Sequence, residues 1–366
     1  MFELTQPGDE TSSPDEPLST PRTLTTAIAF LATVLLGCGL LVMPTQYVVS
    51  SPGPTRDTLG TVPGTEDELI TIAGAETFPG TGELRLTTVS ILGGPGYRVD
   101  AVRVAAGWLS PQAAVAPVEA YFAPEETAEQ VKQESTAAMT TSQEDATVAA
   151  LTEAGYTVPA TLTVVGVIEG TGAVGVLREG DVVTGLDGTT ISTYQQLVET
   201  LAALEPGASV TVAVTRDGAK ERLSVVAGER PGGGALLGVY LDPEFDLPLD
   251  VDIKITDIGG PSAGMMFALG IVDLLTPADE LAGQVVAGTG TVDVVGRVGG
   301  IGGIRQKMYG ARAAGATWFL APAANCSEVV GNVPAGLEVT KVATLAEARA
   351  AVEAIGAGEG APLPRC

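Results

Sequence analysis

The sequence contains no histidine, and this absence excludes several kinds of enzyme. Ser-His-Asp and Cys-His catalytic arrangements need an imidazole as the base, and zinc sites of the His-Glu-x-x-His kind need imidazoles as ligands. A hydrolase with this sequence must therefore use a different base. The chain has only five lysines, so each lysine is worth inspecting as a candidate.

Cysteine is also scarce, and its three copies are Cys38, Cys326 and Cys366. No two of them form a Cys-x-x-Cys pair, so the sequence supports neither a zinc ribbon nor a thioredoxin-like site. We therefore expect the protein to hold no metal ion and to need no cofactor.

Basic side chains are outnumbered, with 19 lysines and arginines against 44 acidic residues and a net charge of −25. We expect no nucleic-acid partner, because such a protein needs a basic surface to displace counterions. The same charge argues against docking on an anionic membrane surface. Hydrophobic residues make up 45% of the 366 positions, which is enough for a large core divided over two or three domains.

The N-terminal part divides into a polar tail and an apolar run. Residues 1–22 are acidic and rich in proline, serine and threonine, and we expect a disordered cytoplasmic tail. Residues 23–43 carry no charge, and a helix of this length crosses the ~30 Å hydrocarbon layer of a membrane. We interpret this run as an uncleaved, single-pass signal anchor that Pro44 ends. The alternatives are a cleaved signal peptide, a buried core helix and a lipoprotein box at Cys38, whose lipidation stays open.

The charges that flank the apolar run set its expected orientation. Arg22 adjoins the first end, whereas Arg56 lies well beyond the second, which favours a cytoplasmic N-terminus. The following domains would then be extracytoplasmic. Cys326 and Cys366 would face an oxidising space, where we expect a disulfide between them, with two unpaired thiols as the alternative.

Two regions of different composition follow the apolar run. Residues 44–155 contain a strand-like alternation at 82–92 and a helical stretch at 124–155. We expect a separate, mixed α/β extracytoplasmic region without catalytic residues. Residues 156–230 predict strands, an amphipathic helix and a hairpin. They carry small, apolar and acidic residues at the positions Ala173, Leu177, Gly180, Asp181, Asp187 and Gly188.

The pattern in residues 156–230 resembles the PDZ domains of bacterial periplasmic proteases. The resemblance implies a domain that binds extended C-termini or unfolded protein segments by adding a strand to a sheet edge. A PDZ domain that serves only as a spacer is the alternative.

The stretch Asp-Ile-Gly-Gly-Pro-Ser-Ala-Gly at 257–264 is the clearest candidate for chemistry. Ser262 lies where a predicted strand turns into an apolar helix. The small neighbours Gly260, Pro261 and Ala263 let a substrate backbone approach, and amides at the helix start would stabilise an oxyanion. The same geometry binds phosphate, but no Gly-x-x-x-x-Gly-Lys-[Ser/Thr] motif is present. A plain helix cap is the simpler alternative for this serine.

A serine nucleophile needs a base, and a desolvated lysine is the usual substitute for histidine. Burial lowers the pKa of a lysine, so that the neutral amine is available near neutral pH. Lys307 lies at the glycine-rich start of a helix whose Ile304 and Met308 would pack inward, which makes it the best candidate. A solvated helix lysine is the simpler alternative.

Three ordered segments, Gly-Gly-Pro-Ser-Ala-Gly, the glycine-rich stretch at 287–307 and the stretch that ends with Asn-Cys-Ser-Glu-Val, resemble the proteolytic domain of Lon proteases. Lys307 follows Ser262 by 45 positions, close to the spacing of the Ser-Lys dyad in that family. The resemblance implies that Ser262 is the nucleophile, that Lys307 is the base and that Thr289 hydrogen-bonds the lysine.

The sequence departs from the Lon pattern at two positions and in its domain content. Gly259 stands where Lon enzymes usually carry an acidic residue, and Thr291 stands where they carry glutamate. No Walker motif for ATP binding is present. The order of anchor, extracytoplasmic segment, PDZ domain and Lon-type domain resembles the YlbL-type, PDZ-containing Lon-like membrane proteases of Gram-positive bacteria.

We therefore expect an α+β multidomain protein, with a Lon-type proteolytic domain at 236–355 and a C-terminal tail at 356–366. The resemblance implies an ATP-independent, membrane-anchored serine endopeptidase that cleaves protein or peptide substrates. It also implies a homo-oligomer, commonly a hexameric ring in Lon-type domains. The alternative is a catalytically inactive PDZ adaptor that binds peptides and uses the Lon-like domain only for assembly.

Overall fold

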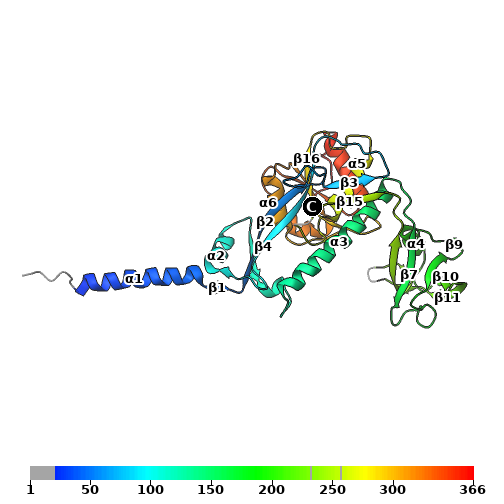
Figure 1. The fold of residues 1–366 in the computed structure, drawn as a ribbon, viewed down its shortest axis with the longest axis horizontal. Helices are drawn as coiled ribbons and strands as arrows, with labels where there is room; N and C mark the ends of the chain where they lie inside the picture. The colour runs from blue at the N-terminus through cyan, green and yellow to red at the C-terminus, as the bar shows by residue number, and fades with distance from the viewer. Residues whose placement is uncertain (1–20, 231–232, 256–257) are drawn as a thin grey trace, which may run out of the picture.

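The computed structural model describes residues 21–230, 233–255 and 258–366. The expected tail at 1–22 therefore lies almost wholly outside the described residues. The described chain has three parts along its longest axis, as Figure 1 shows. A lone helix projects from one end, a body of sheet and helices that also holds the C-terminus lies in the middle, and a smaller sheet domain lies at the other end.

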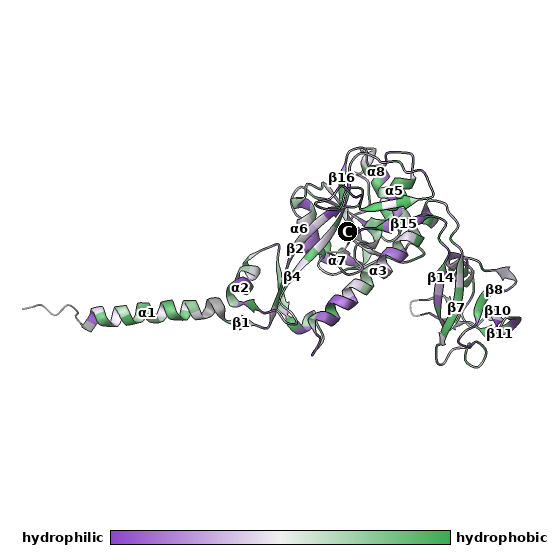
Figure 2. Cartoon of the chain, viewed as in Figure 1, coloured by the Kyte–Doolittle hydropathy of each residue, from purple (hydrophilic) through white to green (hydrophobic). Residues whose placement is uncertain are grey.

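The lone helix is α1 (Pro21–Val42), which covers the apolar run. Its side chains are exposed from Arg22 to Gly39, and Figure 2 shows apolar residues along most of its length. Within the described residues it is the one helix long and apolar enough to cross a membrane. A signal sequence at the N-terminus passes the same test of length and composition.

The central body is built on a six-stranded mixed sheet. Its order is β20 (Glu338–Val342), β19 (Trp318–Pro322), β16 (Val285–Gly288), β4 (Glu83–Leu92), β2 (Tyr47–Asp57) and β6 (Ala114–Pro117). The first four strands pair in parallel, whereas β2 pairs antiparallel with both of its neighbours.

The strand order of this sheet does not follow the expected division of the chain into domains. Residues 44–155 supply β2, β4 and β6, which lie in the same sheet as the strands of 236–355. Because β4 pairs with β16, the two segments form one domain. The region that the sequence treats as separate is therefore an integral half of the central body.

Helices cover both faces of this sheet, and the strands are apolar at consecutive positions for that reason. The covering helices are α3 (Ala128–Glu153), α5 (Gly264–Leu275), α6 (Ile304–Ala313), α7 (Cys326–Val329) and α8 (Leu345–Gly356). In β19, Leu320 joins the core formed with α3, α5 and α8, whereas Phe319 joins the core formed with α6 and α7. Helices α5 and α6 therefore pack on opposite faces of the sheet.

Short elements complete the central body. They are β1 (Pro44–Thr45), β3 (Ile70–Ala73), β5 (Val99–Asp100), α2 (Ala101–Leu109), η1 (Val118–Ala120), β15 (Asp250–Ile253), β17 (Thr291–Val292), β18 (Val298–Gly299) and η2 (Ala323–Asn325). Strand β15 pairs with β3, and β1 pairs with β5.

The smaller domain has its own sheet in the order β11 (Ala219–Val226), β10 (Ser209–Arg216), β8 (Val182–Leu186), β7 (Ala160–Val167) and β14 (Val239–Phe245). Strand β9 (Thr189–Thr190), the β12–β13 pair (Gly228–Glu229 and Ala235–Leu236) and helix α4 (Tyr194–Ala202) complete it. The chain enters this domain after α3 and leaves it through β14 toward β15. The smaller domain is thus an insertion into the central body, and it extends past the expected boundary at 230 to include β14.

Asp181 explains why the motif of the smaller domain contains an acidic residue. Its carboxylate is fully buried and accepts hydrogen bonds at 2.7 Å from both Nε and Nη2 of Arg216. It also accepts one from the amide of Arg178. A bidentate pair with arginine holds the pKa of Asp181 below its ordinary value. The buried charge therefore has the partners that it needs, and this residue is structural.

The expected C-terminal tail packs against the central body. The hydroxyl of Thr340 and the amide of Lys341 both donate to the carbonyl oxygen of Pro364. Cys366 forms a disulfide with Cys326. Residues 356–366 therefore cover the edge of the sheet next to β20.

Candidate active site

Ser262 lies in the loop between β15 and α5, and helix α3 holds this loop in place. The amide of Gly260 donates to the carbonyl oxygen of Ser135 at 3.0 Å. The hydroxyl of Ser142 donates to the carbonyl oxygen of Pro261 at 2.9 Å. Gly260 has a φ of +83°, a left-handed conformation that favours glycine. The turn thus depends on this glycine, on the backbone carbonyl of Ser135 and on the side chain of Ser142.

Lys307 reaches Ser262 from α6. Its Nζ lies 2.8 Å from Ser262 Oγ and 2.8 Å from Thr289 Oγ1. The lysine is only 2% exposed, and burial lowers its pKa from 10.5 to about 7. An ammonium group without water is destabilised, so a substantial fraction of neutral amine is present at neutral pH. The structure therefore brings the two predicted dyad residues together.

Thr289 fixes the direction of the hydrogen bonds around this amine. Its hydroxyl donates to the carbonyl oxygen of Ser262 at 2.9 Å, so its oxygen can only accept from Lys307. A neutral amine that donates to Thr289 keeps its lone pair for the proton of the Ser262 hydroxyl. Thr289 is fully buried, which keeps water out of this arrangement.

The residues predicted to stabilise the oxyanion differ in whether they have a free backbone N–H to donate. Pro261 has no N–H, and the amide of Gly260 is already bonded to Ser135. In the part of the chain that the structure describes, the amides of Ser262 and Ala263 have no acceptor. Both lie at the start of α5, where unpaired amides and the helix dipole favour negative charge. These two amides are the available donors.

Gly259, the position without the acidic residue of Lon enzymes, is in close contact with α3. A Cβ atom built on Gly259 would lie 2.1 Å from the Ser135 hydroxyl oxygen. No side chain fits there unless Ser135 moves. Ser135 thus occupies the space that a side chain at position 259 would need.

A cleft of about 330 Å³ opens beside the two dyad residues. Residues 87–91 of β4 form one wall, and the loop from Ile258 to Ala263 forms the other. Strand β16 pairs with β4 only up to Leu86, so residues 87–91 have one edge without a strand partner among the described residues. The sequence does not predict this wall, because β4 belongs to residues 44–155 and its partner β16 lies about 200 positions later. The alternation at 82–92 predicts the strand but not the strand that pairs with it.

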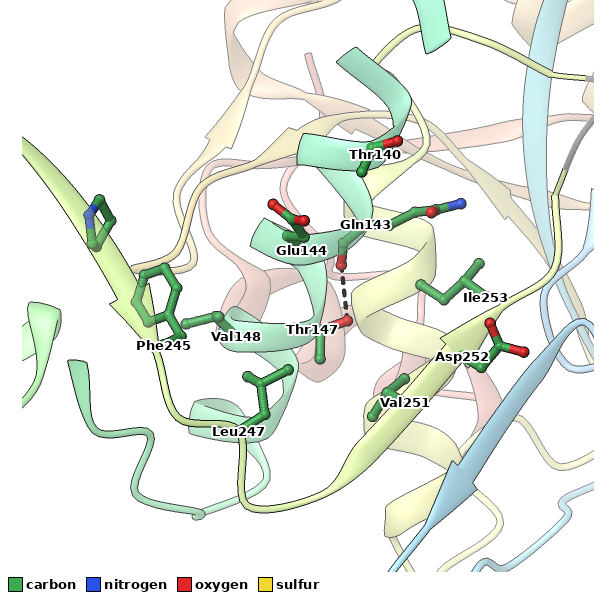
Figure 3. Close-up of a pocket in the computed structure, with 11 residues that line it drawn as sticks. Thr140, Gln143, Glu144, Thr147, Val148, Phe245, Leu247, Val251, Asp252 and Ile253 are labelled. Carbon is green, nitrogen blue, oxygen red and sulfur yellow. Dashed lines mark hydrogen bonds between the residues drawn. The ribbon is translucent and has the colours of Figure 1, made fainter. Parts of the chain in front are cut away.

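A second pocket, of about 450 Å³, lies where the smaller domain joins the central body. Figure 3 shows it between α3 and the chain that runs from β14 to β15. Apolar Phe245, Leu247 and Val251 line it, with Glu144 and Asp252 nearby. The same chain segment continues from β15 to Ser262. This junction therefore links the smaller domain directly to the serine loop.

Cys326 and Cys366 form a disulfide, and the residue before Cys326 supports the lysine helix. Asn325 accepts a hydrogen bond from the amide of Ile301 and donates to the carbonyl oxygen of the same residue. This contact fixes the loop that leads into α6. Among the described residues, no group of three or more acidic or cysteine side chains is placed to hold a metal ion.

Comparison with known proteins identifies both domains. Residues 244–352 match the family model of the Lon protease (S16) C-terminal proteolytic domain, and residues 134–226 match that of the PDZ domain. The chain thus carries a Lon-type proteolytic domain together with a PDZ domain. More particularly, the two matches are consistent with a PDZ-containing, Lon-like protease.

Individual relatives agree with these domain matches. Lon protease 1 of Bacillus subtilis is 30% identical over 158 residues, which are 40% of this chain and 19% of that protein. Lon protease of Clostridioides difficile is 35% identical over 109 residues, which are 28% of this chain and 14% of that protein. The chain thus spans less than a fifth of the length of these relatives.

A solved structure, the PDZ domain of an SdrC-like protein from Listeria innocua, is 22% identical to this chain. The match covers 22% of this chain and 92% of that chain, with a TM-score of 0.22.

Proposed function

We propose that the protein is an ATP-independent, membrane-anchored serine endopeptidase in which Ser262 and Lys307 form the catalytic dyad. One observation carries this proposal: the buried Lys307 Nζ lies 2.8 Å from Ser262 Oγ, and its pKa is lowered to about 7. A lysine with that pKa can take a proton from serine and return it, as a general base and acid must.

The reaction follows from the arrangement of these groups. Neutral Lys307 takes the hydroxyl proton as Ser262 Oγ attacks the carbonyl carbon of the peptide bond. The amides of Ser262 and Ala263 stabilise the oxyanion. The ammonium of Lys307 then gives its proton to the leaving amine, and the C–N bond breaks. Water attacks the acyl-enzyme with Lys307 again as base, which releases the carboxylate product and restores the serine.

The cleft supports an extended peptide as the substrate. The open edge of β4 at residues 87–91 offers backbone donors and acceptors to an added strand. Strand β14 lies at the edge of the PDZ sheet within the described residues, and it leads through β15 to the serine loop. The PDZ domain therefore presents unfolded or C-terminal segments to the dyad. Because the sequence has no Walker motif, substrates must already be extended.

Location and assembly complete the proposal. Helix α1 anchors the protein in the cell membrane, and the PDZ and proteolytic domains lie outside the cytoplasm. The disulfide between Cys326 and Cys366 suits an oxidising compartment. The protein forms a homo-oligomer, in the manner of ring-forming Lon-type domains. No nucleic acid, metal ion or ATP takes part.

Cleavage of labelled casein by the full chain tests the dyad. We expect activity in the native protein and none above background in Ser262→Ala or Lys307→Arg, with all three proteins equally folded by circular dichroism. Mass spectrometry should also find the acyl group of a serine-reactive peptide inhibitor on Ser262. If the native protein is as inert as Ser262→Ala from pH 7 to 10 and Ser262 stays unlabelled, the protein is instead an inactive PDZ adaptor.

A further inference from the structure

Helix α2 has apolar residues on two faces, and only one of them is covered. Val104 and Gly107 are buried against the central body. The opposite face carries exposed Val102, Ala105, Ala106 and Leu109, whose positions i, i+3, i+4 and i+7 form one continuous stripe. Leu109 is 87% exposed. A helix that is apolar on both faces is normally buried on both, so the outward stripe needs a partner.

The position of α2 indicates what this partner is. Its first residue, Ala101, donates a backbone hydrogen bond to Met43, the residue that follows α1. The neighbouring strands β1 and β5 pair Pro44 with Asp100 and Thr45 with Val99. Figure 1 shows α2 beside the end of α1, on the side of the body away from the PDZ domain. If α1 crosses a membrane, α2 must therefore lie at the surface of that membrane.

Aromatic side chains gather at the same place. Trp108 is 64% exposed and packs edge-on against Tyr47, with 5.8 Å between the ring centres. Tyr97, just before β5, is 57% exposed. Tryptophan and tyrosine are enriched where membrane proteins meet the interface, because their rings are apolar and their polar atoms still reach water. One of the two tryptophans of the chain thus stands exposed next to α1.

The charge around α2 is compatible with a lipid surface although the whole chain is strongly acidic. Arg98 and Arg103 are exposed beside the stripe. Asp100 caps the helix and forms an ion pair with Arg103 at 3.3 Å. The local charge is therefore close to balanced, which suits a zwitterionic headgroup layer.

We propose that the outward stripe of α2, with Trp108 and Tyr97 at its side, is inserted into the interface of the bilayer that α1 crosses. This inference rests on the anchoring part of the proposed function. Two attachments, α1 and α2, hold the central body in one orientation and at one height above the bilayer. The cleft at Ser262 then meets extended segments of membrane-associated proteins at a fixed distance from the surface.

Quenching by brominated lipid tests this contact directly, because the chain has only two tryptophans. The full-length Trp318→Phe variant, which keeps Trp108, is reconstituted into phosphatidylcholine vesicles with brominated acyl chains. We expect its emission to fall about twofold or more relative to unbrominated vesicles, as for a ring at the interface. The matched Trp108→Phe variant keeps Trp318 in β19, and its emission should not change.

A surface variant and carbonate extraction separate this inference from the anchoring. Adding Leu109→Asp to Trp318→Phe should abolish the quenching, while casein cleavage in detergent and retention in carbonate-washed vesicles stay unchanged. If the protein is retained in the vesicles but Trp108 is not quenched, the contact of α2 with the bilayer is overturned and the anchoring by α1 stands. Release by carbonate overturns the anchoring and the α2 contact together.

A second copy of the chain is the competing partner for the stripe. In a Cys38→Ser background, Leu109→Cys should form no disulfide-linked dimer under oxidising conditions if lipid covers α2. Disulfide-linked dimers together with unquenched Trp108 would show that the stripe is an interface between copies, and would overturn the proposal.

Discussion

Lys307 Nζ lies 2.8 Å from Ser262 Oγ, although Lys307 lies in α6, Ser262 lies just before α5, and these two helices pack on opposite faces of the sheet. In a Ser-x-x-Lys motif, one turn of a helix would set that distance. Here it depends on the packing of α5 and α6 against β16 and on Thr289, which follows β16 and contacts both residues. The contact between the two proposed dyad residues is therefore a product of the tertiary fold, and changes in packing should affect it.

The pH dependence of peptidase activity should report the lysine. Only the neutral amine acts as base, and burial lowers the pKa of Lys307 to about 7. We expect kcat/KM for a short peptide to rise through about pH 7 and then to level off, as the amine loses its proton. Arginine cannot lose its proton, so Lys307→Arg should lower kcat/KM by about 10²-fold or more at every pH. A rise centred near pH 10 would contradict burial of the lysine.

The free energy of unfolding should also depend on pH because of Lys307. The pKa of Lys307 is lower in the folded state than its ordinary 10.5, so the unfolded chain binds more protons between about pH 7 and pH 10. Stability from this group therefore rises with pH across that window. Lys307→Met removes the buried charge, so its gain in the free energy of unfolding should be largest below pH 7 and should shrink toward pH 10. Urea titrations at several pH values measure the difference.

The contact between Gly259 and Ser135 predicts a pair of coupled substitutions. A Cβ at Gly259 would lie 2.1 Å from Ser135 Oγ but 3.1 Å from its Cβ. Gly259→Ala should therefore lower the activity, and it should lower the free energy of unfolding by about 1–3 kcal/mol, because the serine loop must shift. Removing the hydroxyl with Ser135→Ala should restore part of both. A double-mutant cycle gives the coupling, and purely additive effects would contradict the contact.

The sequence predicted which residues of the candidate site lie together better than it predicted the layout of the domains. The turn around Ser262 and the lysine at 307 are each marked by glycines and by apolar periodicity, which are local signals. The insertion of the PDZ domain leaves no local signal, because it depends on the pairing of β4 with β16 about 200 positions later. The β4 wall of the cleft was missed for the same reason.

Some details of the site could come only from side-chain packing. The sequence marked Gly259 as a difference from the Lon pattern, but its close contact with Ser135, which is distant in the chain, appears only in the structure. Gly260 and Pro261 were predicted as backbone contributors on their position alone. Hydrogen bonding of Gly260 to Ser135 changes which amides are available. Such contacts follow from the path of α3, which sequence periodicity cannot place.

Asp273 should make the protein less stable as the pH rises. It is only 3% exposed, and neither of its oxygens has a hydrogen-bond partner within the described chain. Burial, followed by repulsion from Glu280 and Asp279, raises the pKa of Asp273 to about 7. The folded state then binds the extra proton between about pH 4 and 7, so stability from this group is present at low pH and is lost through pH 7.

Replacing the carboxyl group of Asp273 by an amide should prevent this loss of stability at higher pH. Asp273→Asn should therefore unfold at a higher temperature than the native protein at pH 8, with little difference at pH 4. Asp242→Asn is the control, because Asp242 is exposed and is not among the charges that act on Asp273. The control should leave the unfolding temperature unchanged at both pH values. Equal behaviour of the two variants would contradict the assignment of the raised pKa to Asp273.

Reduction of the disulfide should release the C-terminal segment and leave the contact between Ser262 and Lys307 intact. The bond between Cys326 and Cys366 closes a loop with a sequence separation of 40, and removing a link of this kind costs about 2–4 kcal/mol. The amide of Lys341 donates to Pro364, so its hydrogen exchange should become faster in Cys366→Ser. Peptidase activity at low temperature should persist, because the contacts of Ser262 and Lys307 do not involve the segment. An unchanged unfolding midpoint and unchanged exchange at Lys341 in the variant would show that the segment is held by its other contacts alone.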